Sequence, residues 1–294
     1  MAKVALIAAP NYHELIRSYT AADEAGMLQQ EFARLGVDLS LQSFSDPSVD
    51  WSAFDAVVPK SAWDYFHNPR GFVRWLDNLT AMGVRSINDA ELIKWNHDKN
   101  YLVELRNAGV QVAPFALFRQ GSDPADVVTW LKDEGWDRAV LKPAISGGAW
   151  RTGLIDVANT SEIESFARDI LDGCGLVAQP FFEEIQTEGE WSVLFVEGDP
   201  THTVLKLPKD GDFRSQAIWG GRTKPEQAPD WLLDTTAKIL FAAPGLPTYG
   251  RVDGFVRDGQ FHLMELELIE PYFFFEYAPE HVLNQFAQAI VSRL

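Results

Sequence analysis

The segment from residue 249 to residue 272 carries the strongest structural signal in the chain. Two runs of β-type residues, 250–256 and 261–269, are separated by a short link that contains Asp258-Gly259. An Asp-Gly pair between two such runs is typical of a tight β-hairpin. The pattern therefore predicts two antiparallel strands whose side chains alternate between two faces.

Carboxylates are concentrated on one face of this predicted hairpin. Glu265 and Glu267 leave the same face of the second strand, while Arg251 and Asp253 share a face of the first. Uncompensated carboxylates repel one another, and a hard cation such as Mg²⁺ neutralises such a cluster through oxygen ligands. The alternative is a solvated acidic strand face, but the hairpin has apolar flanks that favour a buried setting: Phe255, Phe261, Leu263 and Leu268. We therefore predict a metal site formed by Asp253, Glu265 and Glu267.

The composition limits the partners that the chain can take. With 294 residues and 46% hydrophobic content, the chain can bury a large core in about two domains. The formal net charge of -17 repels nucleic acid and anionic membranes. The single cysteine, Cys174, cannot form an internal disulfide, and no signal-peptide pattern or run of roughly twenty apolar residues is present. We expect a cytoplasmic protein with no nucleic-acid or membrane partner.

The first 90 residues alternate between strand-like and helix-like segments. Apolar strand runs lie at 4–9, 37–44, 54–59 and 84–87, with helical periodicity between them. This alternation predicts a doubly wound α/β domain with a parallel sheet. One long helix is expected from Ala90 to Ala108. Beyond it the alternation of strands and helices gives way to mixed strands and helices with hairpins, which marks a domain boundary.

The rest of the chain mixes strands, helices and hairpins. Strands are expected at 139–144, 153–157, 176–182, 191–196 and 203–207, in addition to the acidic hairpin. Ser161 and Glu164 form a capping box that would begin a helix, and further helices are expected at 231–242 and from 279 onward. We therefore divide the chain into an N-terminal α/β substrate domain and two α+β subdomains: 1–90, 91–182 and 183–294.

Lys142 stands apart from the general acidity of the chain. It ends an apolar strand and precedes Pro143, so its ammonium group is expected to project toward the Ser146-Gly147-Gly148 turn. Glycines let backbone N–H groups approach phosphate oxygens, and the lysine adds a point charge. An ordinary surface loop is the alternative interpretation. Because neither Gly-x-x-x-x-Gly-Lys-Ser/Thr nor Gly-x-Gly-x-x-Gly occurs, a bound nucleotide would need another fold.

The order of several motifs along residues 88–271 resembles the ATP-grasp superfamily. Each motif alone is unremarkable, and the ordered set is specific. In chain order they are Lys99 in Trp-Asn-His-Asp-Lys-Asn-Tyr-Leu, Lys142 in Val-Leu-Lys-Pro, the Ser146-Gly147-Gly148 turn, Gln179-Pro180-Phe181-Phe182-Glu183, Gly189-Glu190-Trp191-Ser192-Val193, Arg214 in Asp-Phe-Arg-Ser-Gln, and Asp253 with Glu265-x-Glu267.

The resemblance implies that ATP lies between two α+β subdomains and phosphorylates a substrate carboxyl group, and that an amine then displaces the phosphate. It implies that the ATP phosphates contact Lys99, Lys142, Ser146, Gly147 and Gly148. It also implies that adenine lies beside Gln179, Pro180, Phe181 and Phe182 and that Glu190 binds the ribose hydroxyls. The Mg²⁺ ligands that it implies are Asp253, Glu265 and Glu267. Many relatives have Asn at the position of Glu267, so this chain carries an extra negative charge there.

The run from Arg214 to Arg222 is similar to the equivalent run of bacterial glutathione synthetase. This similarity implies that Arg214 lies near the transferred phosphoryl group. Arg214 and Lys142 are therefore the expected catalytic residues, Lys142 neutralising the phosphoryl oxygens and Arg214 stabilising the acyl phosphate.

A narrower resemblance includes the front domain. The motifs Ser61-Ala62-Trp63-Asp64-Tyr65, Lys94 to Lys99, and Glu267-Leu268-Ile269-Glu270-Pro271 are similar to small ATP-grasp proteins related to D-cycloserine synthetase. Tyr272 departs from that pattern, in which a small residue is expected. We expect Trp63, Asp64 and Tyr65, together with Arg251, to contact the substrate, since ligands bind at the carboxyl ends of parallel strands. A packed aromatic cluster is an equally weighted interpretation of the first three.

These observations predict an ATP- and Mg²⁺-dependent ligase that joins a small carboxylate, such as an amino acid or a peptide, to an amine. The alternatives are an intramolecular cyclase of the D-cycloserine synthetase type and a nucleotide-binding accessory protein without turnover. His97 and Cys174 receive no catalytic role. The run Phe273-Phe274-Phe275 is expected in the core, whereas an exposed run would indicate a homodimer contact.

Overall fold

The N-terminal part of the chain forms a parallel sheet. The structure is a computed structural model that describes residues 1–19, 21–215 and 219–294. The sheet has the order β2-β1-β3-β4, and every pairing in it is parallel, as predicted. Its strands are β1 (Lys3–Ala8), β2 (Asp38–Gln42), β3 (Ala56–Ser61) and β4 (Arg85–Ser86), and its helices are α1 (Tyr12–Tyr19), α2 (Glu24–Arg34) and α3 (Pro69–Met82).

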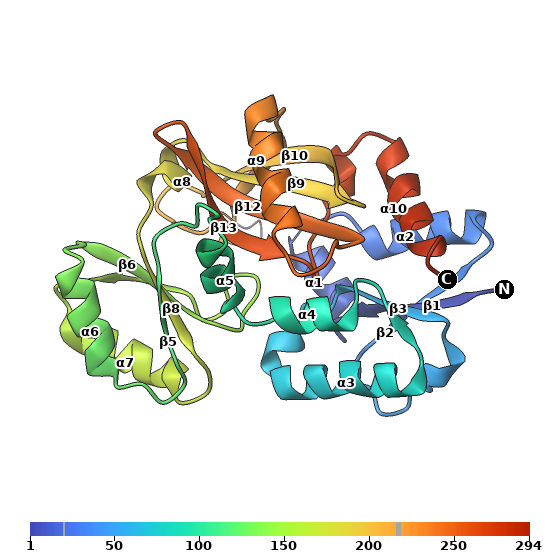
Figure 1. The fold of residues 1–294 in the computed structure, drawn as a ribbon, viewed down its shortest axis with the longest axis horizontal. Helices are drawn as coiled ribbons and strands as arrows, with labels where there is room; N and C mark the ends of the chain where they lie inside the picture. The colour runs from blue at the N-terminus through green and yellow to red at the C-terminus, as the bar shows by residue number, and fades with distance from the viewer. Residues whose placement is uncertain (20, 216–218) are drawn as a thin grey trace.

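The middle of the chain forms a separate antiparallel sheet of order β5-β8-β6-β7. Helices α6 (Pro124–Asp133) and α7 (Thr160–Leu171) pack against this sheet through an apolar cluster that includes Val127, Leu141 and Ile163 (Figure 1). The strands are β5 (Ala116–Phe118), β6 (Arg138–Pro143), β7 (Gly153–Asp156) and β8 (Leu176–Pro180).

The third sheet is antiparallel and has the order β11-β10-β9-β12-β13. Helix α9 (Asp230–Phe241) covers it, and the short helix α8 (Glu183–Thr187) connects it to the middle sheet (Figure 1). The predicted acidic hairpin forms its last two strands. The strands are β9 (Glu190–Val196), β10 (Asp199–Leu207), β11 (Arg222–Pro225), β12 (Tyr249–Arg257) and β13 (Gln260–Glu267).

The chain returns at its C-terminal end to the N-terminal sheet. Helix α10 (His281–Val291) packs beside α2, and the two termini lie near each other in Figure 1. Phe273, Phe274 and Phe275 are at most 8% exposed and belong to the same apolar cluster as Phe286 of α10. The expectation that the aromatic run is core is therefore confirmed, and this run does not form an exposed dimer contact.

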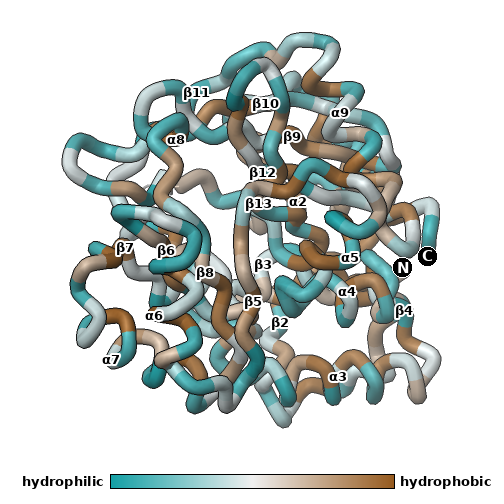
Figure 2. The backbone as a smooth tube through the Cα atoms, turned by 60° about the vertical axis from the view of Figure 1, so that its left-hand side comes forward, coloured by the Kyte–Doolittle hydropathy of each residue, from teal (hydrophilic) through white to brown (hydrophobic). Residues whose placement is uncertain are grey.

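Hydrophobic and hydrophilic residues separate as the predicted elements require. Figure 2 shows hydrophilic turns at the outer ends of the sheets and hydrophobic stretches along the strands and helices between them. Across the described ranges, no helix combines the length and the apolar character needed to cross a membrane.

Two local predictions were wrong. The segment 90–108 forms two helices, α4 (Ala90–Asn96) and α5 (Tyr101–Asn107), instead of one. Asp98 Oδ1 accepts the backbone N–H of Asn100 at 2.9 Å, and such a local side-chain bond competes with helical hydrogen bonding. The cap of α7 is Asn159 instead of Ser161, because Asn159 Oδ1 accepts the N–H of Glu162 at 3.4 Å. The strands β5 and β11 and the helices α1, α6 and α8 were not predicted.

Acidification is expected to destabilise the fold through His202. Its Nε2 donates to the carbonyl oxygen of Phe273 at 2.8 Å, and burial lowers its pKa to about 4 despite the opposing backbone bonds. The unfolded chain keeps the ordinary pKa of 6.5, so it binds the proton more tightly. This contribution to stability is present above about pH 6.5 and is lost as the pH falls toward about 4.

We expect the free energy of unfolding to fall by about 2 kcal/mol between pH 7 and pH 5 from this residue. Urea unfolding of the wild type and of His202→Gln at both pH values measures the difference. A His202→Gln variant with the full pH dependence of the wild type would contradict the assignment.

Candidate active site

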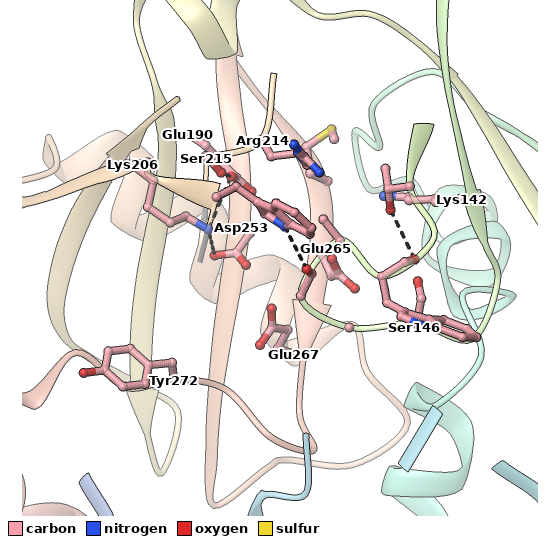
Figure 3. Close-up of a pocket in the computed structure, with 18 of the residues that line it drawn as sticks. Lys142, Ser146, Glu190, Lys206, Arg214, Ser215, Asp253, Glu265, Glu267 and Tyr272 are labelled. Carbon is pink, nitrogen blue, oxygen red and sulfur yellow. Dashed lines mark hydrogen bonds and ion pairs between the residues drawn. The ribbon is translucent and has the colours of Figure 1, made fainter. Parts of the chain in front are cut away.

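A cavity of about 920 Å³ opens where the three sheets meet. The N-terminal part contributes Trp63 and Asp64, the middle sheet contributes Lys142 and Gln179, and the third sheet contributes the acidic hairpin. Figure 3 shows Lys142, Asp253, Glu265 and Glu267 converging from strands that are distant in the sequence. The cavity lining includes nearly all the residues predicted for the site: Trp63, Asp64, Lys99, Lys142, Ser146, Gly147, Gly148, Gln179, Pro180, Phe181, Phe182, Glu190, Arg214, Arg251, Asp253, Glu265 and Glu267.

Hydrogen bonds from α4 and α5 fix the acidic strand β13 at the edge of its sheet. The Asn96 side chain donates to Leu266 O at 2.8 Å and accepts the Leu268 N–H at 2.9 Å. The Tyr101 hydroxyl accepts the N–H of Leu266 at 3.0 Å. Because these bonds replace a missing neighbouring strand, they hold the register of Glu265 and Glu267.

The strand pairing brings the predicted carboxylates together. Asp253 lies opposite Glu265, and Arg251 lies opposite Glu267, so all four side chains occupy one face as predicted. The apolar flanks are at most 1% exposed, which confirms the expected buried setting: Phe255, Phe261, Leu263 and Leu268. The side chains of Glu265 and Glu267 remain 29% and 21% exposed toward the cavity.

Each hairpin carboxylate has a cationic partner. Lys99 Nζ lies 3.0 Å from Glu265 Oε1, Arg251 Nη2 lies 2.9 Å from Asp253 Oδ2, and Arg251 also pairs with Glu267. Burial raises the pKa of Asp253, but the charges of Arg251 and Lys206 outweigh it and hold the pKa at about 2. Burial also raises the pKa of Glu265, and the charge of Lys99 reverses that effect, so the net shift is downward.

The donor set suits Mg²⁺, although it does not form a closed cage. Within the described residues, no group of three or more His, Cys, Asp or Glu side chains is arranged to hold a metal ion. Mg²⁺ usually binds one or two protein carboxylates, completes its octahedron with phosphate and water, and prefers oxygen. Glu265 and Glu267 supply oxygen atoms at the cavity, so the residues fit a metal that arrives with phosphates. The metal role of Asp253, Glu265 and Glu267 stays a prediction.

Lys99 and Lys142 approach the cavity from different elements. Lys99 lies in the turn between α4 and α5, is 4% exposed, and donates to Ser146 O at 2.8 Å. Lys142 lies on β6, and burial lowers its pKa, with the charge of Lys99 acting in the same direction and Glu265 against it. No ion pair of Lys142 occurs in the described parts of the chain. Its ammonium group therefore faces the cavity without an ion-pair partner among the described residues.

The glycine turn is held from both sides. Ser146 Oγ donates to Pro143 O at 3.0 Å, and Trp219 Nε1 donates to Gly148 O at 3.2 Å. A Cβ atom on Gly147 would lie 3.2 Å from Glu270 Oε1 and 3.2 Å from the Phe66 ring, so a larger residue would crowd the cavity. The turn thus spans the space between the middle sheet and the acidic hairpin.

The predicted adenine segment divides into cavity-facing and packing residues. Gln179 is 1% exposed, and neither atom of its amide has a hydrogen-bond partner within the described residues. A buried unpaired amide is costly, and the edge of a nucleotide base presents matching donors and acceptors. Phe182 packs on Phe255 with ring centroids 4.6 Å apart, and the Arg138 guanidinium lies 4.0 Å from the centre of the Phe181 ring.

Glu190 and Arg214 are already engaged by protein partners. Ser215 Oγ donates to Glu190, and Lys206 Nζ lies 3.3 Å from Glu190 Oε2. Arg214 donates from Nε and Nη2 to the two oxygens of Asp212 at 2.9 and 2.8 Å. Its guanidinium also lies 3.7 Å from the centre of the Trp219 ring. Residues Gln216 to Ile218, part of the run that resembles glutathione synthetase, lie outside the described residues.

The front-domain motif is split between cavity and core. Trp63 lines the cavity and donates from Nε1 to Glu270 O at 3.0 Å, and Asp64 lines it as well, with a pKa that burial raises. Tyr65 is 4% exposed and packs in the N-terminal core, with its ring centroid 5.2 Å from that of Phe72. The packing interpretation therefore holds for Tyr65, which corrects its expected place in the substrate contact.

The structure adds cavity residues that the sequence reasoning missed. Lys206 is 4% exposed and lies between Glu190 and Asp253, and Ser192 donates to Asp253. Glu270 also lines the cavity, and burial raises its pKa, with the charges of Glu267 and Glu265 adding to that effect. The sequence signal for Lys206 was its place in the otherwise apolar run Val204-Leu205-Lys206-Leu207.

Comparison with known proteins agrees with this geometry. Residues 4–88 match the family model described as D-cycloserine synthetase DcsG, N-terminal domain. The chain is 29% identical over 279 residues to the cycloserine biosynthesis protein DcsG of Streptomyces lavendulae, covering 88% of this chain and 90% of that protein. A glutathione synthetase of Prochlorococcus marinus (strain MIT 9313) is 33% identical over 106 residues, 35% of this chain and 33% of that protein.

Solved structures extend the similarity to the whole fold. The crystal structure of D-cycloserine synthetase DcsG superposes with a TM-score of 0.88, 25% identity and 99% coverage of each chain. The ATP-grasp ligase PsnB, solved with a phosphomimetic variant of its minimal precursor, Mg and ADP, has a TM-score of 0.65 at 14% identity, covering 99% of this chain and 98% of that one.

The fold and the cavity thus define the protein as one with the ATP-grasp ligase fold. Within that class its sequence and its structure are similar to D-cycloserine synthetase, so the predicted resemblance is confirmed. The division of the chain at residues 90 and 182 stays a prediction.

Proposed function

We propose that the protein is an ATP- and Mg²⁺-dependent ligase that activates a small carboxylate as an acyl phosphate and joins it to an amine. The observation that carries the proposal is the convergence of buried lysines and hairpin carboxylates on one cavity of an ATP-grasp fold. The similarity to D-cycloserine synthetase supports an amino-acid-like substrate.

The lysines would bind and orient the nucleotide phosphates. Lys142 offers an ammonium group without an ion-pair partner in the described chain, and Lys99 lies beside both Ser146 and Glu265. Positive charges placed before the reaction stabilise the charge that develops during phosphoryl transfer. Bound Mg²⁺, held by Asp253, Glu265 and Glu267, would act as a Lewis acid on the phosphate oxygens.

The front of the cavity would orient the substrate and exclude water. Trp63, Tyr272 and Phe274 line this side, with Trp63 and Tyr272 ring centroids 6.3 Å apart. The Tyr272 hydroxyl accepts the Ala22 N–H at 2.8 Å and donates to Glu276 at 2.9 Å, so its position is fixed. A rigid aromatic wall protects an acyl phosphate from hydrolysis because it keeps bulk water from the reacting carbon.

An intramolecular cyclase is the second candidate function. The 0.88 TM-score and 99% coverage against D-cycloserine synthetase favour it, since the two chains share one fold over nearly their whole length. Tyr272 departs from the small residue expected at that position, and its ring would alter the space available to a folded substrate. Product masses separate the two reactions, because cyclisation loses water from one molecule whereas ligation joins two.

We expect ADP to form only when a suitable acceptor is present with ATP and Mg²⁺. Pools of amino acids and dipeptides, assayed for ADP release and by mass spectrometry, identify the substrate and the product. ATP without a pool measures background hydrolysis. If no pool releases ADP above that background while the protein binds a non-hydrolysable ATP analogue, the ligase proposal fails and the accessory-protein alternative replaces it.

A further inference from the structure

Each of the hairpin carboxylates has a cationic partner inside the protein. Lys99 pairs with Glu265, Arg251 pairs with Asp253 and Glu267, and Lys206 lies between Asp253 and Glu190. Figure 3 shows Lys206 directed at Asp253 from the opposite side of the cavity to Lys142. The carboxylates are therefore paired with cations before any ligand is considered.

Asp253 is the most fully engaged of the three carboxylates. Its side chain is 2% exposed, and Arg251 Nε lies 3.0 and 3.1 Å from its two oxygens. Arg251 Nη2 adds a contact at 2.9 Å, Ser192 Oγ donates to Oδ1, and Lys206 Nζ lies 3.5 Å from Oδ1. A carboxylate offers about four lone-pair sites, so these donors occupy its capacity. A metal can reach Asp253 only if one of them moves.

The two cations beside Asp253 are fixed in place. Arg251 is 7% exposed, donates from Nη1 to Tyr272 O at 2.8 Å, and lies 5.7 Å from the centre of the Phe274 ring. Lys206 is 4% exposed and is shared between Asp253 and Glu190, at 3.5 and 3.3 Å. Side chains buried and bonded in this way keep their charge close to the carboxylates instead of moving into solvent.

We propose that Arg251 and Lys206 are resident counter-ions that exclude a free divalent cation from the hairpin and admit it only together with nucleotide phosphates. The proposal rests on the ligase function above and adds the order in which its ligands bind. A lone divalent cation would meet carboxylates that are already paired and two nearby positive charges, which repel it at short range. Nucleotide phosphates supply the missing negative charge and oxygen ligands, and they give Arg251 and Lys206 new anionic partners.

The proposal predicts a gain of metal affinity when a resident cation is removed. Mn²⁺ binding is measured from the loss of its free-ion electron paramagnetic resonance signal, with and without a non-hydrolysable ATP analogue, and the Mn²⁺ bound by the analogue alone is subtracted. We expect the wild type to bind Mn²⁺ at least about tenfold more tightly with the analogue than without it. Arg251→Gln and Lys206→Met are expected to bind Mn²⁺ without nucleotide at least about tenfold more tightly than the wild type.

Arg257→Gln is the matched control for these variants. Arg257 lies on β12, the same strand as Arg251, and pairs with Glu184 at 2.5 Å. Because Arg257 is outside the carboxylate cluster, its loss tests the effect of net charge alone. A gain confined to Arg251→Gln and Lys206→Met, in variants whose thermal unfolding shows that the fold is kept, supports the proposal. If Arg251→Gln does not fold, the Mn²⁺ affinity of Lys206→Met alone tests the proposal.

Two other outcomes separate the failure of this inference from failure of the ligase function. If wild-type protein binds Mn²⁺ alone as tightly as with the analogue, or if neither variant gains affinity over Arg257→Gln, the counter-ion role is wrong and the ligase proposal stands. If the wild type binds no Mn²⁺ even with the analogue, the proposed metal-dependent function is itself wrong.

Discussion

Replacing Glu265 by glutamine is expected to lower acceptor-dependent ADP formation by about three orders of magnitude at limiting Mg²⁺. The substitution keeps the size of the side chain and removes a charged oxygen from the cavity face of the hairpin. Glu265 is 29% exposed and pairs through Oε1 with Lys99, which keeps its hydrogen bonds to Ser146 O and Oγ when that charge is lost. We therefore expect the fold to survive.

The measurement is steady-state ADP release over a range of Mg²⁺ concentrations, with thermal unfolding as the test of folding. Glu91→Gln is the control, because the Glu91 side chain is 78% exposed and pairs only with Lys94 in the described structure. Wild-type rates for Glu265→Gln at limiting Mg²⁺ would remove the acidic hairpin from the mechanism.

The neighbouring substitution Asp253→Asn is also expected to abolish phosphoryl transfer, with a second effect on stability. Asp253 is 2% exposed and holds Arg251 through both of its oxygens. Breaking a buried ion pair on one side typically costs about 3–5 kcal/mol. A lower unfolding temperature for Asp253→Asn than for Glu265→Gln would reflect this difference between a structural and a cavity-facing carboxylate.

The hairpin could be predicted from the sequence because its signals are local. An Asp-Gly link fixes the turn, and alternation predicts which side chains of one strand share a face. The register shift between Asp253 and Gly254, which sets Asp253 opposite Glu265, could not be predicted from spacing. The apolar residues that predicted a buried setting lie on, or directly after, the same two strands as the carboxylates, so the burial signal was also local. In the same way, strand and helix alternation predicted the parallel N-terminal sheet.

The partners of these residues could not be predicted, because they come from distant segments. Ser192 and Lys206 reach Asp253 from β9 and β10, and no periodicity in the sequence joins those strands to the hairpin. Tyr65 follows Trp63 by two residues, but its side chain packs in the core because the backbone turns after β3. The break at Asp98 that places Lys99 in a turn depends on one side-chain bond that competes with the helix.

Loss of Arg214 and loss of Lys142 are expected to affect different steps. Lys142 lies on β6 with no ion-pair partner in the described structure, so its charge is available to a phosphate from the start. Lys142→Ala should therefore mainly weaken ATP binding. Arg214 is held by Asp212 at 2.8 and 2.9 Å and stacks over Trp219, so it must exchange the Asp212 carboxylate for another anion before it can act.

We expect Arg214→Ala to retain nearly full ATP affinity and to lower turnover by on the order of a hundredfold or more, because its charge is required only as the phosphoryl oxygens develop charge. Calorimetry of ATP binding and steady-state turnover, measured for both variants, separate the two effects. Arg34→Ala is the control, since that side chain is 72% exposed and pairs with Glu31 on α2. A loss of ATP affinity in Arg214→Ala that matches its loss of rate, or full turnover in that variant, would show that Arg214 has no separate role at the transition state.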